Sequence, residues 1–74
     1  MAEFKIRAHI TGNLWKIVVA EGQAVVEEDT LVIMESMKME MPIESPVKGL
    51  VRKIFASEGA SVREGDVIMI LEVG

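Results

Sequence analysis

The sequence predicts an all-β fold, in which two related four-stranded antiparallel sheets form a flattened barrel with pseudo-twofold symmetry. Three observations lead there: the chain is short, it consists of two copies of one unit, and each copy reads as β-branched runs separated by turn residues. A sheet of this size cannot bury both of its faces alone. Two related sheets are therefore expected to pack face to face.

The length and composition fit one small domain, residues 1–74, with an aliphatic core. Half of the 74 residues are apolar, but the aromatic residues are only two phenylalanines and one tryptophan. The chain has no cysteine, which excludes disulfides, thiolate metal sites and cysteine nucleophiles. We also expect no other metal site.

The charge pattern argues against nucleic acid as a partner, and the lengths of the apolar stretches argue against a membrane. Eight basic and twelve acidic residues give a net charge of −4, and the basic residues are scattered along the chain. Such a pattern offers no basic patch that could follow a phosphate backbone. No stretch approaches the ~18 uninterrupted apolar residues of a membrane-spanning helix. We expect a cytoplasmic monomer.

The internal repeat is specific. Gly12–Glu35 aligns without gaps on Gly49–Glu72, thirty-seven residues later, with ten identical pairs. The identities include glycines and acids as well as apolar residues, in register: Gly12/Gly49, Lys16/Lys53, Ile17/Ile54, Glu21/Glu58, Gly22/Gly59, Val25/Val62, Glu27/Glu64, Asp29/Asp66, Ile33/Ile70 and Glu35/Glu72. Gly22 and Gly59 fall in tight turns where positive φ is expected, so their role is assigned to the backbone.

Strands are expected wherever β-branched runs lie between turn signals. They are placed at Phe4–His9, Gly12–Val19, Ala24–Glu27, Thr30–Ser36, Met39–Glu44, Gly49–Phe55, Ser61–Arg63 and Val67–Val73. Alternation predicts the buried faces. In one strand the apolar set is Met39, Met41 and Ile43; in another, Trp15, Ile17 and Val19 are set against Leu14, Lys16 and Val18.

The two copies meet at a hairpin whose tip is Met37-Lys38. If Ser36 and Met39 pair across it, these two residues form a two-residue loop. Such loops prefer Asn-Gly, Asp-Gly or Gly-X because φ is positive at one or both central positions. Met-Lys opposes that preference, which indicates that the side chains themselves are needed. We expect Met37 to be exposed and Met41 to belong to the core.

The segment Glu35-Ser36-Met37-Lys38-Met39 resembles the Ala-Met-Lys-Met attachment motif of biotinyl domains in the biotinyl/lipoyl superfamily. The closest type is the small stand-alone biotin/lipoyl attachment protein. The resemblance covers essentially the whole chain, includes Pro46 and Gly49 after the lysine, and implies the barrel-sandwich hybrid fold. Ser36 replaces the usual alanine, and Ala20–Ala24 leaves no room for the "thumb" inserted in some carriers.

The resemblance implies a non-catalytic biotin carboxyl carrier. Lys38 would be biotinylated by a biotin protein ligase that reads Met37 and Met39, with Glu35 and Ser36 as motif context. The carrier would then serve biotin carboxylase and carboxyltransferase sites. Lipoyl domains typically have Asp-Lys-Ala at this turn, so lipoate on Lys38, attached by lipoate attachment enzymes, is the second hypothesis. An unmodified β module that binds proteins is the third.

The remaining polar residues predict no catalytic site. His9 has no recognisable serine or cysteine partner, and we expect it to be structural or solvated. Glu35, Glu40 and Glu44 near the tip are interpreted as a solvated face. Because the first expected strand starts almost at once, the carrier is expected to reach its partners by diffusion or docking, without a tether.

Overall fold

The computed structural model describes residues 2–74 as an all-β domain. Its strands are β1 (Ala2–Arg7), β2 (Gly12–Ile17), β3 (Ala24–Val25), β4 (Thr30–Ser36), β5 (Met39–Glu44), β6 (Gly49–Ile54), β7 (Ser61–Val62) and β8 (Val67–Val73). The sequence placed all of them, with the bounds of β4, β5 and β8 as predicted and the others differing by two residues or fewer at an end. None of residues 2–74 forms a helix that could cross a membrane.

Two four-stranded antiparallel sheets make up the fold, with strand orders β1-β8-β6-β3 and β5-β4-β2-β7. The short strand of each copy of the repeat belongs to the sheet that contains the longer strands of the other copy. Thus β3 pairs with β6, and β7 pairs with β2. This exchange confirms the expected pair of related sheets and ties the two copies together.

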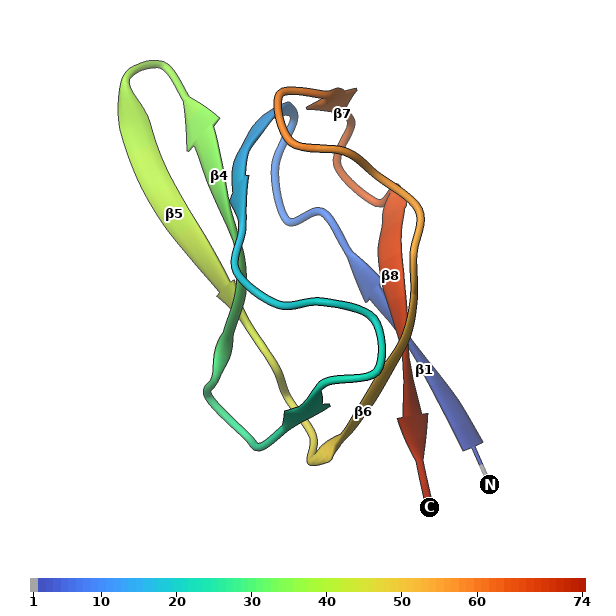
Figure 1. The fold of residues 1–74 in the computed structure, drawn as a ribbon. Coiled ribbons are helices and arrows are strands. Elements are labelled where there is room, and N and C mark those ends of the chain that lie inside the picture. The colour runs from blue at the N-terminus through green and yellow to red at the C-terminus, as the bar shows by residue number, and fades with distance from the viewer. Residues whose placement is uncertain (1) are drawn as a thin grey trace.

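The twofold relation extends beyond the repeat seen in the sequence. β1 and β5 are also thirty-seven residues apart, although they share few identities, and they occupy equivalent edges of the two sheets. The β4–β5 turn is therefore equivalent to the region between the end of β8 and the start of β1. Figure 1 shows the turn at one end of the molecule and both chain ends at the other. The longest dimension of the molecule is 37 Å.

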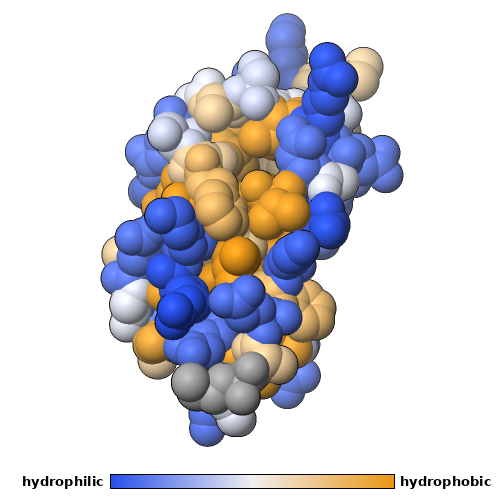
Figure 2. Space-filling model, turned by 90° about the vertical axis from the view of Figure 1, so that its right-hand side faces the viewer, coloured by the Kyte–Doolittle hydropathy of each residue, from blue (hydrophilic) through white to orange (hydrophobic). Residues whose placement is uncertain are grey.

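The core is aliphatic, as the composition predicted. Equivalent residues of the two copies fill it, and the burial pattern of β4 repeats in β8. The side chains with no exposed surface are Leu14, Leu31, Val32, Met34, Val51, Ile68, Met69 and Leu71. Figure 2 shows that some apolar side chains also gather on the outer surface, in the middle of the face on the right of Figure 1.

One predicted face is wrong at Trp15, although Ile17 and Val19 of the same set turn toward the core as expected, and a β-bulge explains the difference. Leu14 is fully buried, whereas Trp15 is 49% exposed. The pairing of β2 with β4 shifts by one residue between Leu14 and Lys16, so Trp15 lies in the bulge. A bulge resets the alternation of side chains, which turns Leu14 inward before the bulge and Val19 inward after it. The same shift occurs between Val51 and Lys53.

Equivalent turns of the two copies have glycine at the same positive-φ positions, with one exception. Gly22 and Gly59 have φ of 90° and 85°, which confirms the expected positive values. In the next turn Gly65 has φ of 91°, but its equivalent in the first copy is Glu28, with φ of 74°. A side chain at positive φ is strained, so the first copy carries a local conflict that the second copy avoids.

Candidate functional site

The candidate site is the β4–β5 hairpin tip, and its backbone is that of a tight turn. Ser36 pairs with Met39, which leaves Met37 and Lys38 as the loop. Their φ values are 52° and 66°, so both lie in the left-handed region. Two positive φ values are the signature of a type I′ hairpin. The register and the backbone expected from the sequence are both confirmed.

This turn is strained for the residues that form it. A non-glycine residue in the left-handed region costs about 1–2 kcal/mol, and here two such residues stand in succession. Strain of this kind concentrates at sites where particular side chains are required. The pairing of β4 with β5 on either side of the turn offsets this cost in free energy.

The side chains at the tip point into solvent. Met37 is 92% exposed, as expected, and Lys38 is exposed beside it. Met39 is 63% exposed, so its predicted place on a buried face is wrong. The hairpin extends past the core at this point, so the side chains on either face of its strands have no core to pack against. Two flexible thioether side chains therefore flank the lysine as an open, adaptable contact surface.

The base of the hairpin is held firmly. Met34, opposite Met41 in the pair, has no exposed surface. Met41 is only half-buried and lies outside the core cluster, so its expected place in the core is wrong. Gly12 of β2 lies against the last residues of β4: a Cβ there would stand 2.5 Å from the Glu35 carbonyl oxygen. This close approach fixes the strand whose next residues form the lysine turn.

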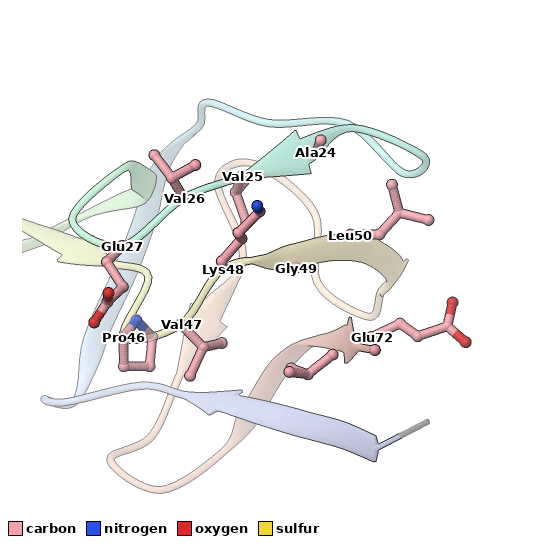
Figure 3. Close-up of a pocket in the computed structure, with 12 residues that line it drawn as sticks. Ala24, Val25, Val26, Glu27, Pro46, Val47, Lys48, Gly49, Leu50 and Glu72 are labelled. Atoms are coloured by element: carbon pink, nitrogen blue, oxygen red, sulfur yellow. The ribbon is translucent and has the colours of Figure 1, made fainter.

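The Lys38 amine has no partner within the part of the chain described, residues 2–74. The ion pairs there are those of Arg52, at the other end of the molecule. None of the grooves described on residues 2–74 includes Met37 or Lys38. One groove lies beside β3 and β6 and is lined by residues that include Val26, Lys48 and Leu50 (Figure 3). A projecting amine without a cleft suits reaction inside the active site of another protein.

The motif residues around Lys38 lie in the expected order. Glu35 and Ser36 end β4 half-buried, and Glu40 follows the turn on β5, exposed and directly opposite Glu35. Glu40 and Glu44 agree with the expected solvated face, whereas the half-buried Glu35 departs from it. The sequence interpretation missed Trp15, whose exposed indole stands on the neighbouring strand. In the aligned repeat Trp15 takes the place of Arg52, and this replacement of a guanidinium by an indole was the signal available in the sequence.

Within residues 2–74 no group of three or more His, Asp or Glu side chains is placed to hold a metal ion. His9 is exposed, in accordance with a solvated role. Ala20–Ala24 forms a tight turn, closed by a 3.1 Å hydrogen bond from the Gln23 amide to the Ala20 carbonyl, so this segment contains no inserted thumb, as expected.

Comparison with protein families gives a match over nearly the whole chain. The sequence model of the biotin/lipoyl family, described as biotin-requiring enzyme, matches residues 5–71. Curated relatives are the biotinylated protein TB7.3 homologue of Mycolicibacterium smegmatis, 51% identical over 43 residues, and that of Mycobacterium leprae, 46% identical over 43 residues. Each alignment covers 58% of this chain and 59% of the relative.

Solved structures give the same fold. A single-chain, multi-domain long-chain acyl-CoA carboxylase matches 93% of this chain with a TM-score of 0.89 and 25% identity. The urea carboxylase of Kluyveromyces lactis matches 97% with a TM-score of 0.90 and 32% identity. The matched parts are 7% and 6% of those longer chains, so the likeness is to one small domain of each.

Proposed function

The chain belongs to the biotin/lipoyl attachment family, and from this premise we propose that it is a non-catalytic biotin carboxyl carrier whose Lys38 receives biotin. The observation that carries the proposal is the tip itself. An exposed lysine stands in a strained turn, between two exposed methionines, at the far end of the molecule from the chain ends. The relatives whose names describe them as biotinylated support biotin as the group attached.

The geometry of Lys38 fits covalent attachment. The amine is exposed and pairs with no carboxylate among residues 2–74, so the modifying enzyme need not break an ion pair to reach it. Attachment forms an amide bond between the lysine nitrogen and the carboxyl carbon of biotin. In a ligase that uses an acyl-adenylate, AMP leaves as this bond forms. The proton that the amine loses passes to a base of the ligase or to solvent.

The proposed role of the folded chain is to present the attached biotin to other enzymes and to carry it between them. Once bound, biotin supplies the carboxyl transfer chemistry. The hairpin holds the attachment point beyond the core, and the carrier moves it between biotin carboxylase and carboxyltransferase sites at high effective concentration. The similarity to domains of an acyl-CoA carboxylase and a urea carboxylase supports partners of this kind. We further propose that the carrier works in the cytoplasm, as a monomer.

Met37 and Met39 are the residues proposed to be read by the biotin protein ligase, with Glu35 and Ser36 as context. Their exposure next to Lys38 makes them accessible together with the amine. Unbranched methionine side chains adapt to an irregular surface. A ligase that grips the turn would therefore contact both while Lys38 enters its active site.

Lipoate is the second candidate, because the name of the matching family contains both biotin and lipoyl. Biotin and lipoate are distinguished by the intact mass of the protein after its expression in cells that supply both cofactors and both attachment enzymes. We expect one biotinyl group per chain. A lipoyl increment alone would replace biotin in the proposal.

A transfer assay tests the carrier role. Biotinylated protein is incubated with a biotin carboxylase, ATP and labelled bicarbonate, then separated from small molecules. We expect ATP-dependent label on the wild-type protein and none on Lys38→Arg, which keeps the charge but cannot be biotinylated at this position. Equal label on both proteins would contradict the proposal.

A further inference from the structure

The two copies differ in how they treat a pair of facing glutamates. In the sheet of the second copy, Glu3 and Glu72 are opposite each other on β1 and β8. Arg52 of β6 binds both: its Nε is 3.7 Å from Glu3 Oε2 and its Nη1 is 3.5 Å from Glu72 Oε1. One guanidinium thus neutralises two carboxylates that would otherwise repel each other.

The repeat places the same two acids beside the lysine. Glu40 is equivalent to Glu3, and Glu35 is equivalent to Glu72; they face each other on β5 and β4. The equivalent of Arg52 is Trp15, in the same bulge of the central strand. Within residues 2–74 no cation pairs with Glu35 or Glu40. The lysine end therefore keeps the carboxylates but has lost the guanidinium.

We propose that Trp15, Glu35 and Glu40 form a docking position for an arginine side chain of the enzyme that modifies Lys38. This inference rests on the proposed function. The second copy is the internal template, because it shows that carboxylates in this arrangement hold one guanidinium. Trp15 is 49% exposed, and the face of an indole is the best aromatic partner of a cation. The incoming arginine also relieves the repulsion between the two acids.

The position of these residues selects the modifying enzyme as the partner. Glu35 and Glu40 are three and two residues from Lys38, so an enzyme whose active site admits the lysine nitrogen must also cover this face. After modification, the attached arm lengthens the side chain. An enzyme that binds only the end of the arm has no need to approach the acids.

An exchange between the two copies tests the proposal. Trp15→Arg places in the chain itself the guanidinium that the ligase would supply, and the template shows that the fold accepts arginine there. We expect biotinylation by the ligase with KM raised about tenfold and kcat nearly unchanged, because an interaction made on docking is lost. The wild-type KM should rise with salt, since exposed charges are screened, while the KM of Trp15→Arg should respond less.

Two control variants separate this effect from changes in fold and net charge. Arg52→Trp makes the reciprocal exchange at the distant end, and Val18→Arg adds a positive charge at another exposed site of the first copy. Both should keep the wild-type KM. Glu40→Gln, which removes one exposed carboxylate, should raise KM in the same direction as Trp15→Arg.

The outcomes distinguish the docking position from the proposed function. Biotinylation of Trp15→Arg with the wild-type KM would overturn the docking position while the carrier role stood. An equal rise in KM for Val18→Arg would overturn it too, because bulk charge would then be the cause. A wild-type protein that the ligase does not modify at all would overturn both.

Discussion

Replacing Met37 by asparagine should make the protein more stable and a poorer substrate of the ligase. Met37 has φ of 52° and a side chain that is 92% exposed. The strain of a left-handed residue is about 1–2 kcal/mol, and asparagine tolerates this conformation at the first position of a type I′ turn. The methionine loses almost no buried surface when replaced. We expect a gain of about 0.5–1 kcal/mol in the free energy of unfolding.

The gain is large enough to measure. In a domain of this size, 1 kcal/mol shifts the melting temperature by about 4–8 °C, so Met37→Asn should melt about 2–8 °C higher than the wild type. The assay is thermal unfolding followed by circular dichroism, with both proteins in the unmodified form. Urea unfolding at constant temperature should give a higher midpoint with an unchanged slope.

The same variant should be biotinylated more slowly, because the thioether proposed to contact the ligase is gone. Initial rates at limiting carrier concentration measure this loss while Lys38 is retained. A melting temperature well below that of the wild type would refute the structural reasoning, since Met37 would then be packed. An unchanged rate of biotinylation would refute its role in recognition.

Two further predictions use the repeat as its own control. Gly12→Ala and Gly49→Ala would each bring a Cβ to 2.5 Å and 2.6 Å from a carbonyl oxygen, of Glu35 and Glu72 respectively, so both should lose about 1–3 kcal/mol in urea unfolding. Only Gly12→Ala, behind the lysine turn, should also slow biotinylation; an equal effect of Gly49→Ala would contradict this. Glu28→Gly should stabilise the protein by about 0.5–1 kcal/mol, and Gly65→Glu should destabilise it by a similar amount, because the two positions share positive φ. Opposite signs in thermal unfolding would show that side-chain contacts, and not φ, decide.

Much of this fold was predictable because the signals were repeated. The aligned copies placed six of the strands, β-branched and alternating runs placed β1 and β5, and Glu-Gly at Glu21-Gly22 and Glu58-Gly59 marked turns whose positive φ the structure confirms. Lys38 was placed at the tip by the point where the copies join. These features depend on local sequence, where turn chemistry and alternation act directly.

The misassigned side chains have a different origin. Trp15 was placed on a buried face because alternation was counted through a bulge, and a bulge is set by hydrogen-bond register with a neighbouring strand. Met39 was placed there because its strand continues past the end of the core. The exchange of β3 and β7 between the sheets was not anticipated either. Each of these depends on contacts between distant segments, which composition and spacing do not encode.

The most direct test of the central claim is peptide mapping of the protein after complete reaction with biotin protein ligase, beside Lys38→Arg and Lys48→Arg. Lys48 is an exposed lysine elsewhere on the surface and serves as the matched control. We expect one biotinyl group, on Lys38, in the wild type and in Lys48→Arg, and none in Lys38→Arg. Biotin on another lysine, or its persistence in Lys38→Arg, would contradict the assignment of the β4–β5 turn as the attachment site.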